Sequence, residues 1–282
     1  MSEDWQALLQ RCSLCPRGCG VDRLAGETGY CGVGAEAVVA SRGPHFGEEQ
    51  PLVGRGGSGT IFFSGCNLRC IFCQNCDISH QVVGVPAPPD ALARMMLELQ
   101  EVGCHNINVV TPTHVTPHIL EAVRLARSGG LTVPTVYNCG GYEKVETLTL
   151  CEGLIDIYMP DTKFTDPEVA RRLASAPDYP EVMRAALLEM HRQVGDLVIE
   201  EGMARRGLLV RHLVMPGGVE AATEVIDFLA DDISTNTYIN VMAQYRPVFR
   251  AREVPEIDRR TVPEEYQAAR AHATARGLRL AE

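Results

Sequence analysis

Three cysteines at C-x3-C-x2-C spacing are the residues in this sequence that could do chemistry. Cys66, Cys70 and Cys73 follow a short apolar run at residues 60–63, so we expect them on a loop at the end of a strand. Three thiolates this close together can bind three irons of a 4Fe–4S cluster and leave the fourth iron without a protein ligand. Because an iron with open positions can bind a substrate and pass it an electron, the spacing predicts a catalytic cluster.

A structural zinc site is the alternative interpretation of this loop. Such a site has four ligands, usually in two pairs, and Cys76 is available as a fourth thiol. The apolar strand before the loop and the Gln74–Asn75 pair after it favour the iron–sulfur cluster. A chance grouping of cysteines is the remaining alternative, because short motifs have false positives.

A second group of cysteines lies near the N-terminus. Cys12, Cys15, Cys19 and Cys31 have C-x2-C-x3-C-x11-C spacing, with glycine and proline beside them that favour tight turns. Four thiolates can bind a zinc ion or an auxiliary iron–sulfur cluster, and the spacing does not distinguish the two. We expect such a centre to hold the Cys-rich segment of residues 1–50 against the rest of the fold.

Apolar runs alternate with helical patterns from residue 59 onward. Six strands are expected, at residues 60–63, 107–110, 133–137, 154–159, 207–215 and 238–243. Continuous apolar runs are typical of buried parallel strands, and repeated βα units predict a parallel sheet with right-handed crossovers. Six units are too few for the eightfold barrel, so we expect an α/β fold with an open, partial (β/α)6 barrel.

The loop at residues 66–73 resembles the signature of radical S-adenosylmethionine (SAM) enzymes. Residues 57–63, 106–114 and 211–217 extend the resemblance to the PflX-like group of that superfamily, whose members are often labelled pyruvate formate-lyase activating enzymes. The resemblance covers nearly the whole chain and departs at Cys76, where a tyrosine would be expected. It implies the same partial barrel, an open iron that binds SAM, and reductive cleavage of SAM to a 5′-deoxyadenosyl radical that abstracts hydrogen.

The resemblance also implies which residues position SAM. Phe72, just before the third cysteine, is expected near the adenine, and Asn138 near the ribose. Asp161 and Lys163 resemble an Asp-x-Lys segment that lies over the methionine moiety. Arg211 resembles an arginine that hydrogen-bonds the ribose or the carboxylate through its planar fork.

The polar residues at the ends of the expected strands should face one cavity, because parallel α/β folds bind ligands at the carboxyl ends of their strands. Thr111 ends the second strand where the superfamily has a Gly-Gly-Glu segment that receives the SAM ammonium group. The sequence departs from the family pattern there, and Thr111 is the residue expected to fill that role.

Three parts of the chain are expected from its composition. Residues 1–50 form the Cys-rich extension, residues 51–245 the partial barrel, and residues 246–282 a C-terminal extension with a helix. Eleven cysteines without a secretory signal indicate a reducing, cytoplasmic setting and metal binding instead of disulfides. No apolar run is long enough to span a membrane. The net charge of −10 argues against a nucleic-acid partner.

The sequence therefore predicts a cytoplasmic radical SAM oxidoreductase. Flavodoxin or ferredoxin is the expected electron donor, and the hydrogen donor is either a glycine of a glycyl radical enzyme, a small molecule, a peptide or an RNA. A metal-binding interaction module without catalytic activity is the alternative class.

Overall fold

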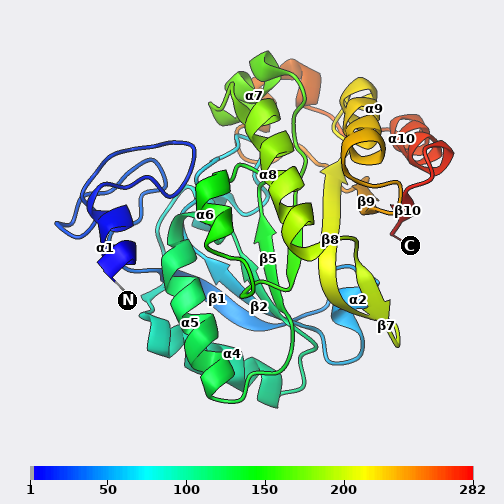
Figure 1. The fold of residues 1–282 in the computed structure, drawn as a ribbon. Coiled ribbons are helices and arrows are strands. Elements are labelled where there is room, and N and C mark those ends of the chain that lie inside the picture. Colours follow the sequence, from blue (N-terminus) through cyan, green and yellow to red (C-terminus); the bar gives the residue numbers. More distant parts are fainter. Residues whose placement is uncertain (1–2, 282) are drawn as a thin grey trace.

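The computed structural model describes residues 3–281, and within this range the strands form one ten-stranded sheet (Figure 1). The strands are β1 (Val38–His45), β2 (Ser58–Phe63), β3 (Val85–Pro86), β4 (Ile107–Val110), β5 (Thr135–Cys139), β6 (Ile157–Pro160), β7 (Val198–Glu200), β8 (Met203–Leu213), β9 (Tyr238–Met242) and β10 (Arg279–Leu280). Their order is β10-β9-β8-β6-β5-β4-β2-β1-β3, and β7 pairs with β8. Every pair from β2 through to β10 along this order is parallel, which confirms the predicted α/β fold with a mostly parallel sheet.

Helices follow the parallel strands, and in Figure 1 several of them cover one side of the sheet. The longer helices are α1 (Glu3–Gln10), α4 (Pro89–Glu101), α5 (Thr116–Ser128), α7 (Pro167–Ala174), α8 (Tyr179–Val194), α9 (Val219–Phe228) and α10 (Pro263–Ala275). Short turns of helix are α2 (Gln50–Val53), α3 (Cys76–Ser79), α6 (Val145–Thr149), η1 (Thr113–Val115), η2 (Leu229–Ile233), η3 (Ala251–Glu253) and η4 (Pro255–Ile257). Among the described residues, no helix combines the length and apolar character that crossing a membrane requires.

The packing explains why the apolar runs predicted strands. All residues of β5 and β6 are buried, and in β2 only Phe62 is half-buried. Helix α5 adds a buried stripe that includes Ile119, Leu120 and Val123. Each such aliphatic side chain contributes about 1.5–3 kcal/mol when it is fully removed from water.

Two segments outside the expected barrel also contribute strands to the sheet. Strand β1 lies within residues 1–50 and pairs antiparallel with β2, and β10 lies within residues 246–282 and pairs parallel with β9. The sequence hides β1 because Gly43 and Pro44 fall inside it and its exposed and buried positions do not alternate. Residue 50 is therefore not a boundary of the sheet.

Strand β5 begins two residues later than expected, and the shift matters for the site. Pro134 has no N–H to donate, although its carbonyl accepts a hydrogen bond from the N–H of Ile107 at 2.8 Å. The regular strand starts after it, at Thr135, and continues through Asn138 and Cys139. Both of these residues are therefore held by strand pairing instead of belonging to a loop.

A buried carboxyl group lies beside the carboxyl ends of β4 and β5. Thr113 Oγ1 donates to Glu143 Oε1 at 2.7 Å, and the hydroxyl of Tyr137 donates to Oε2 at 3.2 Å. The hydroxyls of Thr116 and Tyr137 are themselves 2.8 Å apart. Burial raises the pKa of Glu143 to about 7, although the hydrogen bonds favour its charged form.

Glu143→Gln should change how stability depends on pH. Because the pKa is raised from 4.5 to about 7 in the folded protein, the stability contributed by the neutral carboxyl is fully present below pH 4.5 and is lost as the pH rises through 7. Relative to the variant, the wild type should lose about 3 kcal/mol of unfolding free energy between about pH 4 and pH 8. Urea unfolding of both proteins across this range measures the difference, and two curves that stay parallel would contradict the expectation.

Candidate active site

A cavity of about 420 Å³ lies at the carboxyl ends of the parallel strands. Nine residues expected to bind a cluster or SAM all line it, namely Cys66, Phe72, Cys70, Cys73, Thr111, Asn138, Asp161, Lys163 and Arg211. They come from the loop after β2 and from the ends of β4, β5, β6 and β8. The parallel pairing thus brings residues that are far apart in sequence to one cavity of the size that binds small molecules.

Two of the three loop cysteines accept a hydrogen bond at sulfur, and the third is buried. The N–H of Leu68 donates to Cys66 Sγ at 3.3 Å, and the hydroxyl of Ser79 donates to Cys73 Sγ at 3.2 Å. Cys70 is buried, and burial raises the pKa of its thiol to about 12. A thiolate at Cys70 therefore needs a positive partner such as a metal centre.

The donor set of this loop fits an iron–sulfur cluster. Among the described residues, no three His, Cys, Asp or Glu side chains converge on a point that could hold a single metal ion. Cys66, Cys70 and Cys73 nevertheless line one cavity, and a cluster takes one thiolate on each of three irons, so the donor types suit such a cluster. Cys76, the candidate fourth ligand, starts α3 and does not line this cavity.

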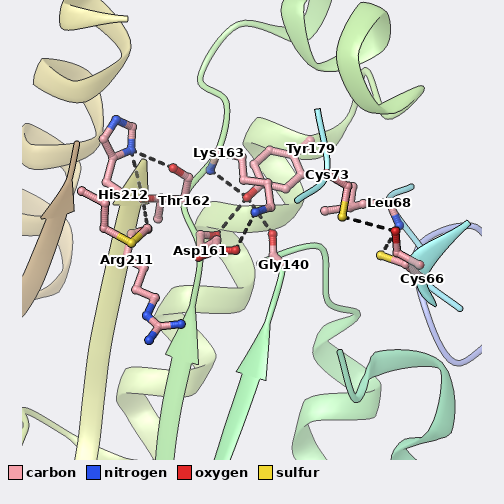
Figure 2. A network of polar contacts seen from close by, with 12 residues as sticks. Cys66, Leu68, Cys73, Gly140, Asp161, Thr162, Lys163, Tyr179, Arg211 and His212 are labelled. Carbon is pink, nitrogen blue, oxygen red and sulfur yellow. Dashed lines mark hydrogen bonds and ion pairs between the residues drawn. The ribbon is translucent and has the colours of Figure 1, made fainter. Parts of the chain in front are cut away.

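Asp161 and Lys163 form an ion pair inside the cavity (Figure 2). Lys163 Nζ lies 2.5 Å from Asp161 Oδ2. The Tyr179 hydroxyl donates to the carbonyl of Asp161 and accepts from the N–H of Lys163, both at 2.9 Å. Burial opposes the charge on Lys163, but the nearby Asp161 and Cys70 outweigh burial and raise the pKa of Lys163. The pair presents one positive and one negative group to a bound molecule.

Arg211 is held by two carboxylates that the sequence did not point to. Its Nε lies 2.7 Å from Glu49 Oε1 and its Nη2 lies 2.6 Å from Glu49 Oε2, while Nη2 also contacts Glu48. Asn240 donates to the same Glu49 Oε1 at 2.7 Å. Burial disfavours a charge on Glu49, but the bonds from Arg211 and Asn240 outweigh it and lower the pKa.

These two glutamates line the cavity, and they already bind the Nε and Nη2 atoms of the Arg211 guanidinium. Glu48 and Glu49 stand in a loop after β1, a strand that the sequence did not reveal. An acidic pair in a loop matches no motif. Their position beside Arg211 becomes evident only from the structure, in which β1 pairs with β2.

Thr111 and Asn138 meet across neighbouring strand ends. Thr111 has a positive φ of 58°, which is rare for a β-branched residue, and its N–H donates to the carbonyl of Asn138 at 2.9 Å. Such a conformation costs about 1–3 kcal/mol and is found mostly at functional sites. Phe72 packs edge-on against Phe164, with ring centroids 6.0 Å apart.

His114, which follows β4, and His212, near the end of β8, do not line this cavity. His212 Nδ1 lies 2.7 Å from the carbonyl oxygen of Thr162, and His114 Nε2 lies 2.8 Å from that of Ser64. Burial lowers the pKa of each to about 4, so both are neutral near pH 7. Cys139 does line the cavity, and burial raises the pKa of its thiol, which keeps it protonated.

The four N-terminal cysteines lie outside the cavity. Cys12, Cys15 and Cys31 are buried and Cys19 is half-buried, and all four are free thiols. The structure therefore separates the two groups of cysteines into two places.

Comparison with known proteins finds a sequence relative and several distantly similar structures. No protein-family model matches the sequence. QueE from Escherichia coli has 12% identity, covers 87% of this chain and 92% of its own, and has a TM-score of 0.44. Native anSMEcpe with bound AdoMet and Cp18Cys peptide has 11% identity, with 77% of this chain and 60% of that chain covered and a TM-score of 0.49. Neither likeness is strong enough to carry an argument about activity.

The sequence relative is the uncharacterized protein MJ0674 of Methanocaldococcus jannaschii. The two are 33% identical over 270 residues, which is 93% of this chain and 74% of the relative. This protein belongs to the same family as MJ0674.

Proposed function

We propose that this protein is a radical SAM enzyme in which Cys66, Cys70 and Cys73 bind a 4Fe–4S cluster and leave one iron open to SAM. The observation that carries the proposal is that the three thiols share one cavity with the six other residues expected to position SAM. When bound, cluster and SAM together supply a 5′-deoxyadenosyl radical that abstracts hydrogen. The residues of the chain bind, orient and shield these groups.

The charged side chains of the cavity suit the parts of SAM. The methionine moiety carries an ammonium and a carboxylate, and the Asp161–Lys163 pair offers an opposite charge to each. Arg211 fixes the carboxylates of Glu48 and Glu49, which are then oriented acceptors for the ribose hydroxyls. In this arrangement Arg211 acts on the ribose through its carboxylate partners.

Buried apolar side chains form part of the cavity wall beside the loop cysteines. Leu68 and Phe72 are buried beside Cys70, and Phe72 packs against Tyr245 as well as Phe164. A dry wall of this kind protects a primary carbon radical from adventitious hydrogen donors and strengthens the ionic contacts.

We propose an external flavodoxin or ferredoxin as the electron donor and the cytoplasm as the setting, where thiols stay reduced. For the hydrogen donor we propose a glycine of a glycyl radical enzyme, supported by the resemblance of the sequence to activating enzymes. Transfer of deuterium from a labelled partner protein into 5′-deoxyadenosine tests this step, and no transfer to an active enzyme would overturn it.

Anaerobically reconstituted protein should form 5′-deoxyadenosine when it is given SAM and dithionite. Cys70→Ala should lower the yield by at least about 100-fold, because a cluster held by two thiolates is not retained. Cys104→Ala is a matched control, since Cys104 is buried but does not line the cavity. Liquid chromatography with mass detection measures the product. A fully loaded wild type that forms none would contradict the proposed function.

Lys163→Met should weaken SAM binding about tenfold or more, because a charge-assisted hydrogen bond contributes about 1.5–3 kcal/mol. The iron content should stay unchanged, since Lys163 is not an iron ligand. Lys144→Met is the control, because Lys144 precedes α6 and does not line the cavity. Equilibrium dialysis with labelled SAM measures both affinities, and equal affinities in the two variants would speak against the assigned role.

A further inference from the structure

The segment between α1 and β1 has no helix or strand in residues 11–37, yet it is ordered against the fold. A stretch of this length without regular structure needs another source of order, such as a metal centre. Its four cysteines are free, and three of them are buried. In Figure 1 this segment forms the blue loops beside the sheet.

The backbone folds the four cysteines toward one another. Cys12 N–H donates to the carbonyl of Val21 at 2.9 Å, and Gly20 N–H donates to the carbonyl of Cys12 at 2.9 Å. This ladder places Cys12 beside the chain that carries Cys19. Tyr30 N–H then donates to Cys19 Sγ at 3.3 Å, which brings the chain before Cys31 to the same place.

The sulfur atoms receive backbone hydrogen bonds in a repeated way. The backbone of Arg17 bonds the thiol of Cys15, and the backbone of Val33 bonds that of Cys31. The same two-residue offset links Leu68 to Cys66 in the loop of the proposed catalytic cluster. N–H groups aimed at sulfur stabilise a thiolate, which is the form that binds metals.

Gly29 lets the chain approach one of these sulfurs closely. A Cβ atom at Gly29 would lie 2.8 Å from Cys19 Sγ. A side chain at residue 29 would clash with the Cys19 sulfur, so the present position of this thiol requires a glycine at residue 29.

A buried cation beside these cysteines has no counter-charge among the side chains that the structure describes. Arg23 is 0% exposed, and its Nη1 lies 2.7 Å from the carbonyl oxygen of His114 and 4.0 Å from Cys12 Sγ. Its Nε donates to the carbonyl of Gly34 at 2.8 Å, its Nη2 has no hydrogen-bond partner, and no carboxylate side chain of residues 5–281 pairs with it. An unpaired buried guanidinium is costly, whereas four thiolates on a metal centre carry the negative charge it lacks.

We propose that Cys12, Cys15, Cys19 and Cys31 bind a second iron–sulfur cluster, distinct from that of the catalytic loop. The thiols lie near enough to one another to interact electrostatically, since Cys12 and Cys31 act on Cys15, and Cys12 and Cys19 act on Cys31. Zinc draws four sulfurs to about 2.3 Å from one centre, whereas a cluster binds each thiolate through a different iron. Because the backbone of Cys31 contacts Gly65 at the start of the catalytic loop, a centre that carries electrons suits this place better than zinc, a preference that rests on the proposed function.

The second cluster would lie against the catalytic loop. A Cβ at Gly65 would be 2.6 Å from the carbonyl oxygen of Cys31, so these two backbones are in direct contact. Arg17 Nε donates to the carbonyl of Asn67 at 2.8 Å, and Arg69 donates to the carbonyl of Tyr30 at 3.2 Å. The N-terminal centre thereby braces the loop that carries Cys66.

Metal analysis of anaerobically reconstituted protein tests the proposal. The wild type should hold about eight irons and eight sulfides per chain, and the Cys66→Ala/Cys70→Ala/Cys73→Ala variant about four of each. Adding Cys12→Ala and Cys31→Ala to that variant should remove the rest. Adding Cys104→Ala and Cys151→Ala instead, at two other buried cysteines, should not.

A wild type with about four irons that are all lost in the Cys66→Ala/Cys70→Ala/Cys73→Ala variant, or one with about one zinc per chain, would overturn the proposal. The result is independent of the proposed SAM chemistry. If the triple variant retains iron but the wild type forms no 5′-deoxyadenosine, the proposed function is contradicted and the second cluster is not. If a wild type that forms 5′-deoxyadenosine holds only the cluster of the catalytic loop, the second cluster is contradicted and the proposed function is not.

Discussion

Parallel pairing of β2, β4, β5, β6 and β8 is the constraint on which the rest of the structure depends. It places the carboxyl ends of all five strands at one edge, so the polar group after each strand faces a common cavity. The cysteine loop follows β2, and Asp161 and Lys163 reach it from the end of β6, which lies three places away in the sheet. A slip of one residue in β6 would turn these side chains to the opposite face.

Much of this arrangement could be predicted from the sequence, because buried parallel strands leave continuous apolar runs. All six expected strands exist, and the three loop cysteines share a cavity with the polar strand ends. Strand β1 could not be predicted, because its exposed edge residues follow no alternation. Glu48 and Glu49 were missed for the same reason, since their contact with Arg211 depends on where β1 pairs. The raised pKa of Glu143 also depends on long-range packing, which leaves no local sequence pattern.

The cavity and the N-terminal segment use hydrogen bonds to sulfur in the same manner. The backbone of Leu68 donates a hydrogen bond to the sulfur of Cys66, and the backbone of Arg17 does the same for Cys15. In both places the donor lies two residues after the cysteine. The two places differ in what compensates charge. Lys163 has Asp161 as its partner, whereas Arg23 has no carboxylate in the described part of the chain. The cavity is therefore suited to a ligand that carries both a positive and a negative group, and the N-terminal segment to an anionic metal centre.

The central claim is that one iron at the catalytic loop is free to bind SAM. Electron paramagnetic resonance of the reduced Cys12→Ala/Cys31→Ala variant isolates the cluster held by Cys66, Cys70 and Cys73. Adding SAM should shift the signal, because a new ligand at the open iron changes its electronic environment. A spectrum that stays the same at saturating SAM would contradict the account.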